Sequence, residues 1–290
     1  MTSLLHRVKA KMAIFAHRKA RGMIDGEYGS VFRGRSLDFD DLRAYVPGDE
    51  VRDIDWKATA RHGSPLIKRY VAVRRQTVLL ITDTGRNMAA MAEGGEVKKD
   101  IAVMALGVVG YLAHRHGDVV GLVSGDSAAT LSLPAKGGEA HLERLLRHVH
   151  SSTSEDGAGS RIQEQLGHVA RTVKGRHLLF VVADEMVADP ELGRLLRRLR
   201  AQHEILWLTV RDAELAAAGD WYSVDDSAPL MGQLARSPAV AAAYRKAAAE
   251  RDTGRDNMLR QAGITHGSVA GSSDVVTALF ALLERHRRAG

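Results

Sequence analysis

The chain contains no cysteine among its 290 residues. Disulfides, zinc–thiolate sites and thiol nucleophiles are therefore excluded. Long apolar runs are also missing, because no stretch approaches the roughly 18–20 residues that span a bilayer. Arg7, Lys9 and Lys11 interrupt the apolar core that a secretory signal needs. We therefore expect a cytoplasmic protein, with no more than peripheral contact to a membrane.

The signatures of several common catalytic sites are missing as well. No Gly-x-x-x-x-Gly-Lys-Ser/Thr phosphate loop occurs, which excludes self-contained ATP hydrolysis. Ser124, in GLVSGD, lacks the Gly-x-Ser-x-Gly spacing of a nucleophile elbow. His114 and His116 are two residues apart, as are His148 and His150. Residues with this spacing point to different faces of a helix, so neither pair forms a His-x-x-x-His metal site.

The charge balance is basic, with 41 Lys+Arg against 35 Asp+Glu and a pI of about 9.6. The strongest candidates for contacts to nucleic-acid phosphates are Arg194, Arg197 and Arg198, which share one helical face. Solvated helix faces commonly look like this, and no nucleic-acid motif or aromatic platform accompanies these arginines. We therefore expect no nucleic-acid partner.

What the sequence does contain is a regular alternation of apolar runs and amphipathic segments. Residues 77–83, TVLLITD, form a β-branched apolar run that ends in an acid, and residues 177–184, HLLFVVAD, repeat this pattern. Such runs are typical of buried parallel strands. Strands that alternate with helices predict a doubly wound, mainly parallel α/β sheet. We predict strands at 66–73, 77–83, 118–124, 129–133, 177–184, 204–210 and 265–269, and helices at 4–21, 96–114, 139–150, 162–173, 190–200, 239–262 and 274–288.

The predicted domain division places an N-terminal arm at residues 1–76 and the α/β domain at residues 77–290. The arm begins with an amphipathic basic helix. This pattern fits a helix that lies on a membrane or a partner. It also fits a helix docked on its own domain, which is what such stripes usually indicate. The apolar face is formed by Leu4, Leu5, Val8, Met12 and Phe15.

The second part of the arm is the motif RAYVPGDEVRDIDWKATAR at residues 43–61. Pro47 and Gly48 predict a tight turn, and Asp55 is expected to cap a short helix at residues 56–61. Charges of both signs surround Trp56. The motif is therefore either an ion-pair network that staples the arm around a buried Trp56, or a preformed docking surface.

Two predicted strands end in an acid, Asp83 and Asp184, and a loop between them in sequence offers Ser160. In open α/β sheets, ligands bind just outside the carboxyl ends of the strands. Carboxylate and hydroxyl oxygens are ligands that Mg²⁺ accepts. The sequence therefore predicts a binding site at this edge. A metal-dependent hydrolase that uses Asp83 and Asp184 is the alternative.

The same residues carry a resemblance to von Willebrand factor A domains. DTGRN, residues 83–87, resembles their Asp-x-Ser-x-Ser motif, GSRI, residues 159–162, resembles their threonine loop, and Asp184 takes the place of their third-loop acid. The resemblance implies a metal-ion-dependent adhesion site that holds Mg²⁺ and binds a partner's carboxylate. It would be degenerate, because Gly85 has no side chain and Asn87 replaces a serine. The implied ligands are Asp83, Asn87, Ser160 and Asp184.

The motif at residues 43–61 is similar to the signature of the bacterial domain of unknown function 58 family, and the resemblance covers roughly residues 25–285. It implies a von Willebrand factor A-like domain with no established enzymatic activity. Members are often encoded beside MoxR-type AAA+ ATPases and are regarded as their adaptors. We therefore expect a non-catalytic adaptor or assembly factor that binds a partner protein at the carboxyl edge. The motif residues are Arg43, Tyr45, Pro47, Gly48, Asp49, Arg52, Ile54, Asp55, Trp56, Lys57, Ala60 and Arg61.

Overall fold

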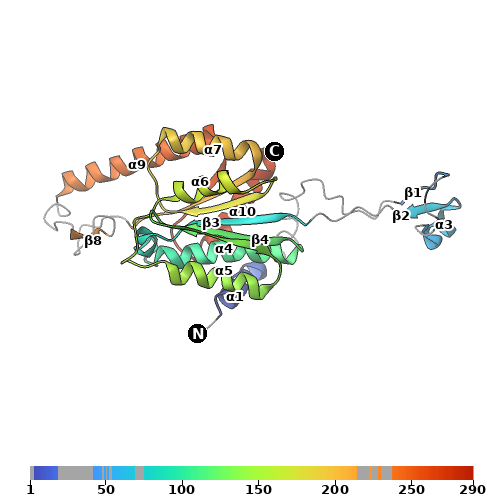
Figure 1. Ribbon diagram of the computed structural model, residues 1–290. Helices are drawn as coiled ribbons and strands as arrows, with labels where there is room; N and C mark the ends of the chain where they lie inside the picture. The colour runs from blue at the N-terminus through green and yellow to red at the C-terminus, as the bar shows by residue number, and fades with distance from the viewer. Residues whose placement is uncertain are drawn as a thin grey trace. The chain divides into compact units, whose positions relative to one another are not determined.

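A computed structural model describes residues 3–18, 42–47, 49, 51, 54–68, 75–213, 222–223, 228–229 and 237–289 (Figure 1). The chain forms two units, a body of Met1–Val31 with Gln76–Gly290 and a small unit of Phe32–Arg75. Two motif positions, Gly48 and Arg52, lie outside the described residues, as do the predicted ends of the first helix and of the strand at 66–73.

The body is built on a six-stranded sheet with the order β10-β7-β6-β3-β4-β5. All neighbouring strands are parallel except β5, which forms an antiparallel hairpin with β4. The mainly parallel α/β sheet predicted from the sequence is therefore confirmed. The strands are β3 (Thr77–Asp83), β4 (Val119–Gly125), β5 (Thr130–Lys136), β6 (Leu178–Ala183), β7 (Glu204–Val210) and β10 (Thr265–Val269).

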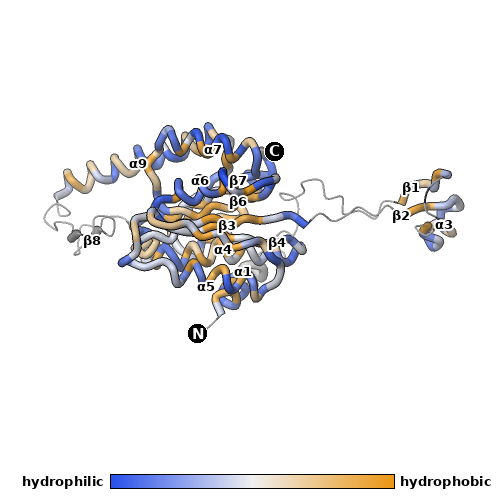
Figure 2. The backbone as a smooth tube through the Cα atoms, in the orientation of Figure 1, coloured by the Kyte–Doolittle hydropathy of each residue, from blue (hydrophilic) through white to orange (hydrophobic). Residues whose placement is uncertain are grey.

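Helices cover both faces of this sheet, and the apolar strands lie between them (Figure 2). Leu79 and Ile81 of β3 pack into a core with α6 and α7, whereas the alternate residues Val78 and Leu80 face the other layer, as the two-residue period of a strand requires. One layer holds α4 (Lys98–Arg115), α10 (Val275–Ala289) and α5 (Glu139–Ser152), and the other α6 (Ile162–Thr172), α7 (Pro190–Gln202) and α9 (Pro238–Gln261). A 3₁₀ turn, η2 (Arg86–Ala89), follows β3, and β8 (Tyr222–Ser223) pairs with β9 (Ala228–Pro229).

The N-terminal helix α1 (Leu4–Arg18) is docked on the body through its apolar face. Leu5, Val8 and Met12 are buried against α4, α5 and α10. The Glu143 carboxylate of α5 accepts hydrogen bonds from the backbone N–H groups of Leu4 and Leu5 at 3.1 and 2.8 Å. An anion at a helix N-terminus is stabilising. Of the two alternatives for this helix, docking is observed, and α1 belongs to the body rather than to the small unit.

The small unit pairs β1 (Leu42–Ala44) with β2 (Leu66–Lys68) in a two-stranded antiparallel sheet of its own, beside α3 (Trp56–His62). The predicted cap is confirmed, because Asp55 Oδ1 accepts from the backbone N–H groups of Lys57 and Ala58 at 3.0 Å each. Gly63, at φ 80°, ends the helix in the left-handed conformation that glycine favours.

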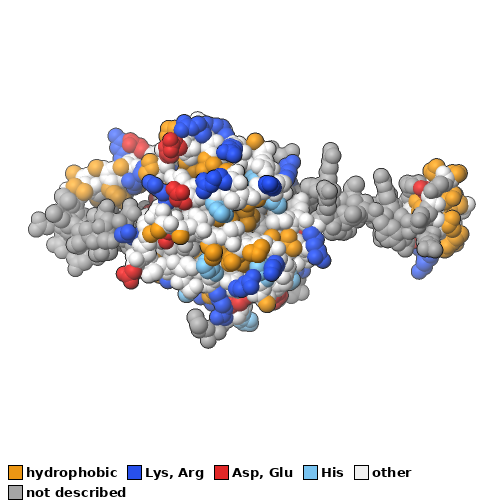
Figure 3. All heavy atoms as spheres, viewed as in Figure 1, with side chains coloured by type: hydrophobic (Ala, Val, Ile, Leu, Met, Phe, Trp, Pro, Cys, Tyr) orange, Lys and Arg blue, Asp and Glu red, His pale blue; other side chains and the backbone are white. Residues whose placement is uncertain are grey.

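Of the two alternatives for this motif, the staple around a buried Trp56 is wrong, because Trp56 is 65% exposed. Trp56 shares the outer face of α3 with Lys57, whereas Thr59 faces the strand, where its hydroxyl accepts from the Leu66 N–H at 3.0 Å. Val46 and Val51 are also exposed, and apolar side chains gather on the surface of this unit (Figure 3). The charges therefore do not staple the arm around a buried tryptophan.

Because Trp56 loses little contact with water on folding, Trp56→Ala is expected to change the stability of the small unit by less than about 1 kcal/mol. Ile67→Ala, in the same unit, is the matched control. Ile67 is 5% exposed, so its truncation should cost roughly 2–4 kcal/mol. Amide hydrogen exchange across residues 54–68 measures both. A loss for Trp56→Ala as large as that for Ile67→Ala would show that the indole is covered.

Gly107 of α4 allows α1 to approach closely, since a Cβ at Gly107 would lie 2.5 Å from Val8 Cγ2. Gly107→Ala is therefore expected to destabilise the body by roughly 1–3 kcal/mol through overpacking, despite the better helix propensity of alanine. Denaturant unfolding measures this loss. In a Val8→Ala background, Gly107→Ala should lower the free energy of unfolding by less than it does in the wild-type background. If the loss is the same in both backgrounds, the contact with Val8 is not its cause.

Candidate functional site at the carboxyl edge of the sheet

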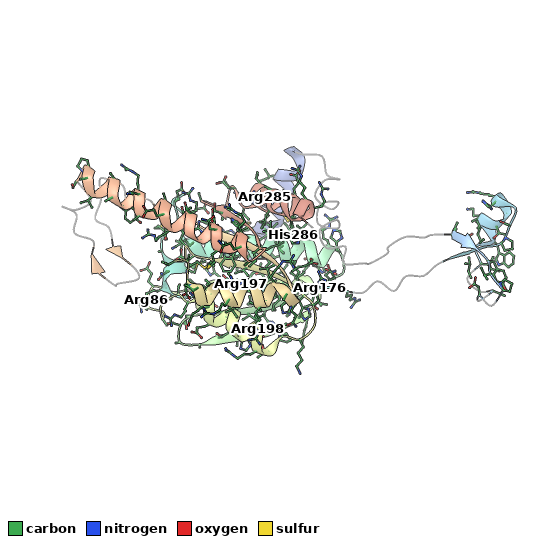
Figure 4. All side chains as sticks on the ribbon, turned by 90° about the horizontal axis from the view of Figure 1, so that it is seen from above. Arg86, Arg176, Arg197, Arg198, Arg285 and His286 are labelled. Carbon is green, nitrogen blue, oxygen red and sulfur yellow. The ribbon has the colours of Figure 1, made fainter. Side chains whose placement is uncertain are left out.

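Asp83 and Asp184 stand at the carboxyl ends of neighbouring parallel strands. In the β3–β6 register Thr82 pairs with Val182, so both acids follow at the same edge. Arg86, just after β3, and Arg176, just before β6, lie toward opposite ends of the body and mark the carboxyl and amino edges (Figure 4). Parallel pairing therefore delivers both carboxyl groups to one edge.

Three loops converge around Asp83. The Thr84 N–H donates to the Gly125 carbonyl at 2.7 Å, which ties the segment after β3 to the β4–β5 turn. The Arg86 N–H donates to the Ala158 carbonyl at 2.9 Å, which ties the same segment to the α5–α6 loop. Ser160, in that loop, is thereby held next to Asp83 and Gly85.

The Asp83 carboxyl group is buried, with 2% of the residue exposed. Burial raises its pKa from 3.8 to about 6, although the Gly85 N–H, the Ser160 hydroxyl and the Arg161 amide act in the opposite direction. The Gly85 N–H donates to Asp83 Oδ1 at 2.6 Å. Within the described part of the chain, no basic side chain forms an ion pair with this carboxylate. Asp83 is therefore a buried acid that receives no counter-charge from the described residues.

Asn87 adds a second acceptor to the segment after β3. It belongs to η2, and its side-chain oxygen Oδ1 is buried without a hydrogen-bond partner among the residues that the structure describes. A buried polar atom of this kind costs free energy unless a donor satisfies it. The α6 side of the edge therefore presents acceptors, namely Asp83 and Asn87, beside Ser160.

Gly85 is required by the close approach of the α5–α6 loop. A Cβ at Gly85 would lie 2.6 Å from both the N and the Cα atom of Ser160, and 2.7 Å from its Oγ. Backbone atoms at this distance cannot yield without a shift of the loop. A serine ligand at position 85, as in Asp-x-Ser-x-Ser, is therefore incompatible with this arrangement.

Asp184 has a different environment, because Lys98 holds it. The Lys98 Nζ atom lies 2.7 Å from Asp184 Oδ1 and also donates to Asp212, which follows β7. Burial lowers the pKa of Lys98, but Asp184 and Asp212 more than offset this effect and leave the pKa above its ordinary value. Burial raises the pKa of Asp184 to about 7, and the Lys98 ammonium opposes that rise. We call Lys98, Asp184 and Asp212 the lysine cluster.

Sequence reasoning missed Lys98 and Asp212, although each left a signal. Asp212 stands two residues after the strand EILWLTV, so three neighbouring strands and not two are followed by an acid at this edge. Lys98 is the first residue of α4, where a cation is disfavoured by the helix dipole. A lysine in that place, ahead of a largely apolar helix, indicates that some carboxylate pairs with it in the folded protein, although not which one.

The four residues implied as Mg²⁺ ligands separate into two groups. Asp83 and Ser160 are held together, with Asn87 in the adjoining segment, whereas Asp184 pairs with the Lys98 ammonium. A divalent ion at Asp184 would face a fixed positive charge, and Gly85 contributes no ligand. Across the described residues, no cluster of three or more His, Asp or Glu side chains suits a metal ion. The residues present therefore do not fit the implied Mg²⁺ site.

The fold and this edge define a mixed α/β protein with buried acids at the carboxyl ends of its central strands. The family model described as protein of unknown function DUF58 matches residues 41–254, and the chain belongs to that family. The chain is 26% identical over 279 residues to the uncharacterized proteins Rv1480 of Mycobacterium tuberculosis and Mb1516 of Mycobacterium bovis, covering 93% of this chain and 86% of each relative.

The chain also has a match among solved structures. The matched protein is an aerotolerance-related membrane protein from Bacteroides fragilis, with a TM-score of 0.44 and 12% identity, and the match covers 74% of this chain and all of that one. In the part of the present chain that is described, no helix has the length and apolar character needed to cross a membrane.

The raised pKa of Asp83 makes stability depend on pH. Because the folded protein holds this proton more tightly than the unfolded chain, the resulting stabilisation is complete below about pH 4 and is lost as pH rises through about 6. Asp83→Asn keeps an acceptor for the Gly85 N–H but cannot ionise. At about pH 7.5 we expect it to raise the free energy of unfolding by roughly 1–3 kcal/mol. Urea unfolding at several pH values measures this, and a less stable variant at pH 7.5 would contradict it.

Proposed function

We propose that this protein is a non-catalytic adaptor or assembly factor that binds a partner protein at the carboxyl edge of the body sheet. The observation that supports it is Asp83, a buried carboxylate to which the described residues offer no counter-charge, beside the Asn87 oxygen, which none of them satisfies. Both features lower stability, and costly buried groups of this kind cluster at functional sites. A partner that donates hydrogen bonds or a positive charge would satisfy both.

The kind of partner is proposed from the family resemblance. We propose that the body is von Willebrand factor A-like and that the protein works in the cytoplasm with a MoxR-type AAA+ ATPase. The order of the motifs along the chain supports this, with DTGRN after the central strand, Ser160 in the loop before α6 and Asp184 after the next buried strand.

The hydrolase alternative receives less support from the geometry. It needs Asp83 and Asp184 to act on one metal or one substrate, but Asp184 is paired with the Lys98 ammonium, which would repel a shared metal ion. A panel of phosphoester and peptide substrates with added Mg²⁺ or Mn²⁺ tests this alternative. Turnover that Asp184→Ala abolishes would replace the adaptor proposal with an enzyme.

The adaptor proposal is tested with the purified MoxR-type ATPase of the same host by biolayer interferometry. Ser160→Arg places a bulky cation just before the amino end of α6, at the carboxyl edge of the sheet, and we expect it to weaken binding at least tenfold. Thr172→Arg lies at the opposite end of the same helix, near the amino edge, and is the matched control. Melting curves check that both variants fold. Equal binding by wild type and Ser160→Arg would contradict the proposed face.

A further inference from the structure

We infer that the ammonium group of Lys98 is the resident cation of this edge and takes the place of a divalent ion there. Its Nζ atom donates to carboxylates from two neighbouring strand ends, Asp184 after β6 and Asp212 after β7. Lys98 is 1% exposed, so the charge is enclosed by protein. A buried charge of this kind is stable only when it is paired.

The remaining hydrogen bonds close the lysine cluster. Asp184 Oδ1 also accepts from the Glu185 N–H at 2.7 Å. The Asp212 N–H donates to Glu185 Oε1 at 3.3 Å. The Asp212 side chain is 42% exposed, which gives the cluster its contact with solvent. The arrangement thus has two carboxylates around one central cation, as oxygen ligands surround a metal.

The backbone around Lys98 is fixed by neighbouring loops, so the ammonium is placed in advance of any ligand. The Lys98 N–H donates to the Ala90 carbonyl at 2.9 Å. The preceding loop is held at Gly94, whose N–H donates to the Ala270 carbonyl at 2.9 Å, and at Glu96, whose carboxylate accepts from the Ser272 N–H at 3.0 Å. These bonds connect the start of α4 to the segment after β10.

The consequence is that a partner meets this part of the edge without a metal ion. A bound divalent ion would depend on free metal concentration and could be removed by a chelator, whereas a lysine is always present. Lys98 is thus a positioning residue that fixes the side chains of Asp184 and Asp212. That Lys98 and not a metal ion occupies this edge does not depend on which partner binds. That the partner binds without a metal ion rests on the proposed function.

Removal of the ammonium should convert the cluster into a metal site. In Lys98→Ala, Asp184 and Asp212 would face each other without a counter-charge, and two carboxylates with retained waters suit a divalent ion. Isothermal titration with Mn²⁺ and thermal melting with and without Mn²⁺ are the measurements. We expect Lys98→Ala to melt lower than wild type and to regain several degrees with Mn²⁺, while wild type shows no shift.

Two further variants act as controls. Lys99→Ala removes the neighbouring lysine, which donates to the Thr153 carbonyl and not to the lysine cluster, and it should remain insensitive to Mn²⁺. Lys98→Ala combined with Asp184→Asn should lose the response gained by Lys98→Ala. If Lys98→Ala does not fold alone, refolding with Mn²⁺ is the readout, and recovery of the native circular dichroism spectrum supports the inference.

Two results would overturn the inference: Mn²⁺ binding by wild type that Asp184→Asn abolishes, or a Lys98→Ala protein that gains nothing from Mn²⁺. Binding of the ATPase, measured with and without EDTA, distinguishes an error in this inference from an error in the proposed adaptor function. Binding that EDTA abolishes contradicts metal independence but leaves the adaptor role. An ATPase that does not bind at all contradicts the adaptor role and leaves the titration result intact.

Discussion

Burial of charge at the end of a parallel sheet is the constraint on which this structure depends. Because β3, β6 and β7 run in the same direction, the acids that follow them gather at one edge. Buried carboxylates that lie near one another must be paired, protonated or supplied with hydrogen bonds. The chain uses an internal ammonium for Asp184 and Asp212, and backbone N–H groups for Asp83.

These two solutions have different consequences for binding. The lysine cluster satisfies its charges within the molecule, so this part of the edge is complete before any ligand arrives. On the Asp83 side, the part of the chain that is described leaves a buried carboxylate without a counter-charge and the Asn87 amide oxygen without a donor. A ligand would gain more free energy where the protein has left groups unsatisfied. Under the proposed adaptor role, a partner's donors would therefore bind on the Asp83 side, next to the lysine cluster.

The sequence predicted those features that depend on local pattern. The apolar runs at 77–83 and 177–184 are the central strands, and Asp55 caps the helix that its position indicated. Lys98 could not be assigned a partner, because its carboxylates lie 86 and 114 residues away along the chain. The exposure of Trp56 could not be predicted for a related reason. The charged residues near it in the sequence do not show which face of a seven-residue helix is covered by other elements.

Gly85 and Lys98 together explain why the edge departs from the metal site that its motif resembles. They act by different physical routes, since Gly85 leaves no space for a serine ligand beside the Ser160 backbone and Lys98 supplies the positive charge at Asp184. Either one alone would weaken a divalent site. A site that merely lacked a ligand would leave its acids unpaired, but Asp184 is paired with Lys98 of α4. The edge is therefore better described as organised around a lysine than as an incomplete metal site, and the Lys98 ammonium holds Asp184 and Asp212 without a metal ion.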